Sequence, residues 1–118
     1  MSEIAWLSHE TVGDVEVVRL VGEVDASNGS RLSAELLGAV SNQARAVVLD
    51  LSNTTYIDSS GISLIFDVAA GVRSRRQQLR LVVVPRSFVA EVLSTVSIDE
   101  SIPIDAVIGD ALEALQAQ

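Results

Sequence analysis

The sequence contains no cysteine, no lysine and a single histidine, and these gaps exclude several kinds of chemistry. Without cysteine the chain has no disulfide, no thiol nucleophile and no thiolate ligand for a metal. Without lysine it has no P-loop, no Schiff-base lysine and no lysine general base. The histidine, His9, falls at the end of a predicted strand, far in sequence from the other candidate residues. We interpret it as a surface residue of a hairpin without a visible partner, and not as a ligand.

Aromatic residues and long apolar runs are also scarce. Only 3% of the residues are aromatic although 48% are hydrophobic, so the core has to be built from valine, leucine, isoleucine and alanine, as in layered α/β proteins. No apolar run approaches the roughly 18 residues of a membrane-spanning helix. Residues 1–3 lack the basic and apolar regions of a signal peptide. We therefore expect a cytoplasmic protein without membrane insertion.

Positive charge is in short supply, because only eight basic residues, all arginines, accompany 16 acidic residues and the net charge is −8. Such a field repels DNA, RNA and anionic lipid, so we expect no nucleic-acid partner. The acidic residues are scattered and lack the spacing of a zinc site or a calcium loop. We predict no metal and no cofactor.

The 118 residues fit one domain, residues 1–118, which is large enough to bury about two thirds of the unfolded surface. Periodicity predicts strands at residues 4–9, 14–21, 46–51 and 79–84, helices after the last three of them, an irregular or short-strand segment at 98–108, and a final helix capped by Asp110. Helical connections make the later strands parallel. The predicted fold is α/β, with a mixed sheet of four to five strands, an antiparallel N-terminal hairpin, the remainder parallel, and about four packed helices.

The stretch from residue 45 to residue 76 organises the rest of the chain. Residues 46–51 form an apolar run interrupted only by an aspartate, the pattern of a central strand covered on both faces. After a polar loop and spacer, Asp58 stands where a helix N-cap is wanted. The apolar residues that follow at helical spacing are Ile62, Ile65, Phe66, Ala69 and Val72.

Two serines, Ser59 and Ser60, fall in the first turn of this predicted helix. Free N–H groups and the helix dipole there would favour a phosphate on either hydroxyl, and the residues alone do not choose between the two. Because parallel strands end at one edge of a sheet, the loops at 22–25, 53–61 and 85–87 should gather near these serines. Asp25 in the first loop fits a turn residue as well as a functional one. The arginines between residues 73 and 80 read as a solvated helix end outside the site.

Two separated motifs in register resemble the STAS domain family and, more narrowly, the bacterial anti-sigma factor antagonists. They are residues 20–25, Leu-Val-Gly-Glu-Val-Asp, and the segment from the strand at 47–52 to the Asp-Ser-Ser-Gly-Ile turn at 58–62. The resemblance covers nearly the whole chain and implies a single STAS domain. It also implies that the first serine of the turn, Ser59, is the phosphate acceptor. The partner-binding residues expected on this basis are Gly22, Glu23, Asp25, Asp58, Ser59, Ser60 and Gly61.

The resemblance implies a function as well. Unphosphorylated, the protein would bind an anti-sigma factor with serine kinase activity and so free the sigma factor. Phosphorylated on Ser59, it would let go until a phosphoserine phosphatase reset it. The base and metal that activate the hydroxyl belong to the kinase, so the chain needs no catalytic residue and is expected not to be an enzyme.

Two alternatives use the same residues. The first is a scaffold or adaptor, a STAS subunit of a stressosome-like complex or of an ABC-type lipid transporter, against which the intact acceptor turn argues. The second is an enzyme with Ser59 or Ser60 as nucleophile. That reading lacks a Gly-x-Ser-x-Gly motif, a nearby histidine and an oxyanion loop.

Overall fold

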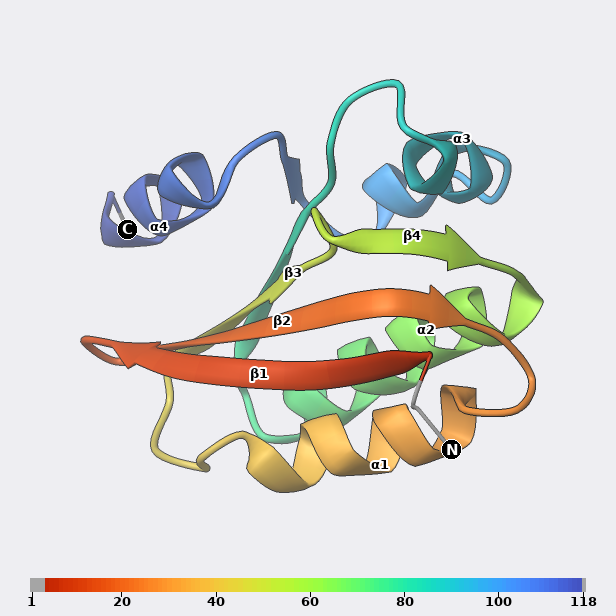
Figure 1. Ribbon diagram of the computed structural model, residues 1–118. Helices are drawn as coiled ribbons and strands as arrows, with labels where there is room; N and C mark the ends of the chain where they lie inside the picture. The colour runs from red at the N-terminus through yellow and green to blue at the C-terminus, as the bar shows by residue number, and fades with distance from the viewer. Residues whose placement is uncertain (1–3, 118) are drawn as a thin grey trace.

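Helices cover both faces of a six-stranded sheet in the computed structural model, which describes residues 4–117 (Figure 1). Residues 1–3, which carry the expectation about a signal peptide, lie outside the described residues. The elements in chain order are β1 (Ala5–Val12), β2 (Val15–Val24), α1 (Gly29–Ala39), β3 (Ala46–Asp50), β4 (Thr54–Ile57), α2 (Ser59–Ser74), β5 (Gln78–Val82), α3 (Phe88–Ser94), the 3₁₀ turn η1 (Ile98–Glu100), β6 (Ile104–Asp105) and α4 (Ile108–Gln116).

The sheet is mixed, as predicted. β1 and β2 form an antiparallel hairpin, and β3, β5 and β6 continue in parallel in the order β1-β2-β3-β5-β6. All five residues of β3 are buried, which confirms the prediction of a central strand covered on both faces. One core cluster lies between the sheet and α1 and α2, and a smaller one lies under α4 on the other face (Figure 1).

The core is aliphatic, and every aromatic side chain of the protein is exposed. The four are Trp6, Tyr56, Phe66 and Phe88. The prediction that Phe66 lies on the buried face of its helix is therefore wrong. The buried stripe of α2 is formed by Gly61, Leu64, Ile65, Val68, Ala69 and Val72. Successive helical residues are about 100° apart, so Phe66, one position beyond the buried Ile65, is turned toward solvent.

β4 is the element that the sequence pattern missed. A loop and spacer is predicted at residues 54–57, but Thr54–Ile57 is a strand parallel to β2, with Val24 paired to Ile57. β3 and β4 pair with successive parts of β2. The turn between them is closed because Asp50 Oδ1 accepts hydrogen bonds from the N–H and the hydroxyl of Ser52, at 2.9 and 2.6 Å. The polar residues thus mark the point where the strand paired with β2 changes from β3 to β4, and not the end of the sheet.

Several element ends also differ from prediction. β1 and β2 are longer, running to Val12 and Val24. β5 ends at Val82, opposite the last residue of β3, where its pairing partner stops. Asp110 is not the cap of the last helix, which begins at Ile108 with Val107 in the N-cap position. Ile108 packs against the smaller core cluster, and this contact favours an earlier start than the capping pattern indicates.

A close backbone approach shapes the end of β2. The pairing of β2 with β4 shifts register between Gly22 and Glu23. Gly22 has φ 103°, a conformation that side-chain-bearing residues rarely adopt, and an added Cβ would collide with the carbonyl oxygen of Ile4. The Gly22 N–H donates to the carbonyl of Asn53 at 3.0 Å, and the Glu23 N–H donates to that of Ile4 at 2.9 Å. Gly22 therefore holds three chain segments together.

Replacing this glycine should be costly. Gly22→Ala combines a strained φ with the clash at Ile4, and we expect it to lower the free energy of unfolding by more than about 2 kcal/mol. Gly38→Ala is the matched control, because nothing lies within 4 Å of an added Cβ in this exposed part of α1. It should be neutral or stabilise by up to about 1 kcal/mol. Urea denaturation measures both, and a Gly22→Ala protein as stable as wild type would contradict the described close approach.

Candidate functional site

Asp58 caps α2, as predicted. Its Oδ1 accepts a hydrogen bond from the Ser60 N–H at 2.8 Å, and its carbonyl oxygen accepts one from the Ile62 N–H at 3.1 Å. Ser59 is the first helical residue and is exposed, whereas Ser60 is half-buried. The N–H groups of Ser59 and Gly61 donate to no group among residues 4–117. The turn therefore offers an accessible hydroxyl beside free donors, an arrangement that tolerates an anion.

Two glycines allow this turn to pack tightly. A Cβ added to Gly61 would lie 2.7 Å from the Cβ of Ile57, so the start of α2 rests directly on the end of β4. A Cβ added to Gly29 would lie 3.2 Å from the Cβ of Ser60, so the N-terminus of α1 lies against the same turn. This second approach covers Ser60 and leaves Ser59 as the more accessible hydroxyl.

The loop after β2 is held by a buried asparagine. Asn28 Oδ1 accepts from the Asp25 N–H at 3.0 Å, and Asn28 Nδ2 donates to the Glu23 carbonyl at 2.9 Å. The Asp25 carboxylate accepts from the N–H and the hydroxyl of Ser27, at 2.9 and 2.6 Å. Asp25 is thus a turn residue in the structure, which is one of the two roles that the sequence allows. The bridging role of Asn28 could not be read from the sequence, because it depends on contacts with the preceding loop.

An aromatic pair joins the third loop to the other two. The rings of Tyr56 at the end of β4 and Phe88 at the start of α3 stack with centroids 5.6 Å apart and an interplanar angle of 11°. Ser87 caps α3 by accepting from the Ala90 N–H at 3.1 Å. Together with the pairing of Val24 and Ile57, these contacts bring all three predicted loops to one edge of the sheet (Figure 1).

This edge is acidic. Glu23 is exposed, Asp25 and Asp58 are half-buried, and none of the three has an ion pair among residues 4–117. The hydroxyl of Ser27, and after it the Ser27 N–H, hold the pKa of the Asp25 carboxyl below its usual value, so Asp25 is charged at neutral pH. The third loop adds one basic residue, Arg86, which is exposed and has a left-handed backbone conformation with φ 63°.

The other polar residues singled out in the sequence lie elsewhere. Arg75 donates to the carbonyls of Leu37 and Val40 at the opposite end of α2, and Arg80 pairs with Asp105, which agrees with leaving the arginine cluster outside the site. These are structural contacts.

The interpretation of His9 needs a correction. His9 has a partner, because its Nδ1 lies 3.0 Å from Oε1 of the buried Glu16, which also accepts from the Thr11 hydroxyl at 3.1 Å. The two residues are diagonal neighbours across the β1–β2 hairpin, and only the pairing register brings them together. Among residues 4–117, no three potential metal ligands converge. The same part of the chain has no helix long and apolar enough to cross a bilayer.

Comparisons with known proteins agree on the kind of domain. A family model described as "Mlab, STAS domain" matches residues 7–108. BtrV of Bordetella bronchiseptica, described as a candidate anti-sigma factor antagonist, is 33% identical over 75 residues, which cover 64% of this chain and 65% of that protein. The matched part thus spans slightly less than two thirds of the relative's length.

Solved structures share the fold. An anti-sigma factor antagonist from Mycobacterium paratuberculosis is 22% identical, with a TM-score of 0.81 over 95% of this chain and 94% of its own. SpoIIAA in its unphosphorylated form is 18% identical, with a TM-score of 0.76 over 96% and 98%. The phosphorylated form of the Bacillus protein has a TM-score of 0.64 at 18% identity over 93% and 99%.

The cap yields a prediction about stability. Asp58→Ala removes the acceptor for the Ser60 N–H and should lower the free energy of unfolding by about 1 kcal/mol, a drop in melting temperature of about 4 °C. Asp58→Asn keeps a capping oxygen and should stay within a few tenths of a kcal/mol of wild type. Calorimetry of the wild type and the two variants measures these differences. Equal melting temperatures for Asp58→Ala and wild type would count against the cap.

Proposed function

The chain belongs to the STAS domain family, and on that premise we propose that it is an anti-sigma factor antagonist switched off by phosphorylation of Ser59. The observation that carries the proposal is the exposed Ser59 hydroxyl in the first turn of α2, beside the loop that follows β2. The descriptions of BtrV and of the Mycobacterium structure support the assignment. The structures of SpoIIAA, which has the same fold, in unphosphorylated and phosphorylated forms support the switch.

The proposed binding surface consists of the first turn of α2 and the loop after β2. Its residues are Gly22, Glu23, Asp25, Asp58, Ser59, Ser60 and Gly61. The two segments are neighbours because β2 and β4 pair at their ends. Gly22, Asp25 and Gly61 shape this surface, whereas the exposed Glu23 and Ser59 side chains are available to a partner. The carboxylates favour a partner that presents basic side chains.

The proposed switch rests on the different effects that a phosphate on Ser59 should have on the fold and on the interface with a partner. Phosphate on Ser59 adds about −1.5 to −2 charges at neutral pH. The free N–H groups and the dipole of α2 favour an anion, so the fold should remain intact. A partner surface matched to a neutral hydroxyl and to the nearby carboxylates would face crowding and an added desolvation cost. Losing tenfold affinity takes only about 1.4 kcal/mol.

The chemistry is proposed to belong to other proteins. An anti-sigma factor with serine kinase activity would supply the base and the metal, and a phosphoserine phosphatase would remove the phosphate. His9, the one histidine of the sequence, is hydrogen bonded to Glu16 on the hairpin. It is therefore not positioned to activate Ser59. We therefore propose that the protein is not an enzyme and that it acts in the cytoplasm together with these partners.

The acceptor assignment predicts a pattern of variants. Ser59→Ala should bind the anti-sigma factor and resist phosphorylation, Ser59→Glu should stay folded but bind poorly, and Ser60→Ala should still accept phosphate. Incubation with the cognate kinase and ATP, followed by peptide mapping by mass spectrometry, identifies the acceptor. Phosphate on Ser60 would overturn the assignment, and full binding by the phosphorylated protein would rule out the switch.

The binding surface is tested by charge reversal. Asp25→Arg should weaken association with the anti-sigma factor by at least about tenfold, whereas Glu113→Arg on α4 should leave it unchanged. Asp25→Asn separates charge from structure, since an amide oxygen can still accept the hydrogen bonds from Ser27. If Asp25→Arg and Glu113→Arg weaken binding equally, the surface is wrongly assigned. Capture of a transporter ATPase in place of an ATP-binding kinase would favour the adaptor alternative.

A further inference from the structure

The exposed face of α2 carries apolar side chains in line with Ser59. Successive helical residues are about 100° apart, so Phe66, seven positions after Ser59, points within about 20° of it and lies about 10 Å farther along the helix axis. The Phe66 side chain is 43% exposed. The half-buried Ile62 and the exposed Ala70 continue the same row at a spacing of four residues. The acceptor hydroxyl and an apolar row therefore share one face of the helix.

The first two turns of α2 carry no charge. Residues 59–66 contain no charged side chain, although 20% of the chain is charged, and the two charged residues of this helix, Asp67 and Arg73, follow later. The exposed face of a surface helix is ordinarily charged or polar. A lack of charge together with an accessible aromatic ring is instead typical of the centre of a protein–protein interface.

A kinase that acts on Ser59 has to cover this face. Transfer of a phosphoryl group requires that the active site of the kinase lie directly over the Ser59 hydroxyl. A specific interface buries about 800 Å² on each partner, and a round patch of that area extends roughly 16 Å from its centre. Phe66 shares the direction of Ser59 and is separated from it by about 10 Å along the helix axis, so it falls inside this footprint.

We propose that Phe66 anchors the anti-sigma factor on α2, with its ring inserted into an apolar pocket of that partner beside the kinase active site. The inference rests on the proposed function and adds a residue to its binding surface. Because Phe66 does not reach the acceptor hydroxyl two turns away, it contributes to the affinity of the complex and not to the transfer step. A phosphate on Ser59 leaves this apolar contact unchanged, so release comes from crowding and desolvation at the first turn of α2.

Two variants remove the anchor without opening the core. Phe66→Ala and Phe66→Gln replace an exposed ring, so both proteins should keep the far-ultraviolet dichroism of wild type. The probe is the kinase that phosphorylates Ser59 in the peptide-mapping experiment, loaded with ADP. Titration calorimetry should show each variant binding it at least about tenfold more weakly than wild type. In phosphorylation assays, KM for the protein should rise by a similar factor while kcat stays within about twofold.

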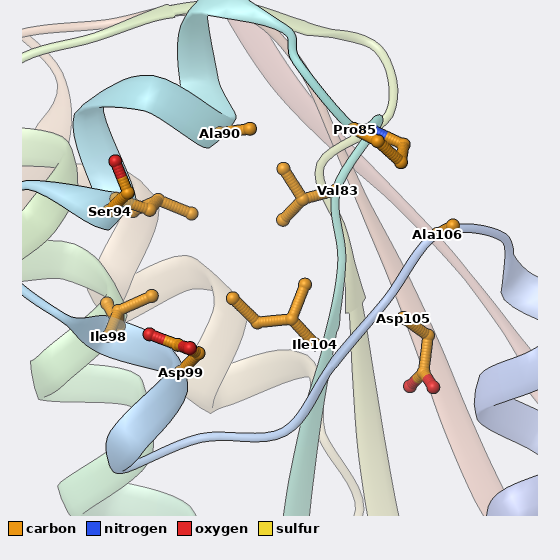
Figure 2. A pocket seen from close by; sticks show the side chains of 10 residues that line it. Val83, Pro85, Ala90, Ser94, Ile98, Asp99, Ile104, Asp105 and Ala106 are labelled. Atoms are coloured by element: carbon orange, nitrogen blue, oxygen red, sulfur yellow. The ribbon is translucent and has the colours of Figure 1, made fainter.

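Val107→Ala is the matched control. Val107 is 55% exposed and directly follows Ala106, which lines the cavity between α3, η1 and the ends of β5 and β6 (Figure 2). It precedes α4, which covers the other face of the sheet. This variant removes an exposed apolar side chain from the far side of the sheet and should bind as wild type does. Equal affinities of Phe66→Ala and wild type, or equal losses in Phe66→Ala and Val107→Ala, would overturn the anchor while leaving Ser59 as the acceptor.

Two other outcomes are told apart by the same proteins. If no kinase phosphorylates Ser59 of the wild type, the proposed function fails and the anchor fails with it. If sedimentation shows a dimer of the wild type that Phe66→Ala dissociates, the face binds a second copy of the chain, and the anchor is overturned without any consequence for Ser59. The proposal requires the same oligomeric state in wild type and in Phe66→Ala.

Discussion

The site depends on the contact between the first turn of α2 and the ends of β2 and β4. No side chain fits between Gly61 and Ile57, and the pairing of Val24 with Ile57 fixes the loop after β2 beside that turn. The approach of Gly29 to Ser60 fixes the start of α1 against the same place. Three backbone segments thus meet with almost no intervening side chains. The positions of the site residues therefore follow from main-chain packing.

The hydrogen bonds that hold this arrangement together do not involve the Ser59 hydroxyl. The cap bond of Asp58, the bridge made by Asn28 and the turn at Asp25 are satisfied inside the chain. The hydroxyl of Ser59 takes part in none of them. A change of charge at that hydroxyl therefore alters what the surface presents without breaking an internal hydrogen bond. A modification site placed inside the hydrogen-bond network would instead trade binding against stability.

The sequence predicts those features whose signals are local. Asp58 as a cap and a central strand at residues 46–51 follow from a capping residue and from an apolar run with a single aspartate, and the structure has both, the strand ending at Asp50. β4 could not be predicted in the same way, because four residues after a polar turn show no periodicity and their pairing is decided by distant β2. The contacts of Asn28 and of His9, and the stacking of Tyr56 on Phe88, likewise depend on register or on the meeting of loops. For the site, the sequence could indicate the pair of serines, while the burial that distinguishes them depends on Gly29 of another helix.

The exposure of all four aromatic side chains has a spectroscopic consequence. The single tryptophan, Trp6, lies on β1 with 48% of its surface accessible, and the one ring contact among residues 4–117 is the pair of Tyr56 and Phe88 at the surface. Its indole is therefore partly hydrated in the native protein, and the aliphatic core contributes no near-ultraviolet signal. Tryptophan emission and near-ultraviolet dichroism therefore report on the surface of the domain, while far-ultraviolet dichroism, amide exchange and methyl resonances report on its interior.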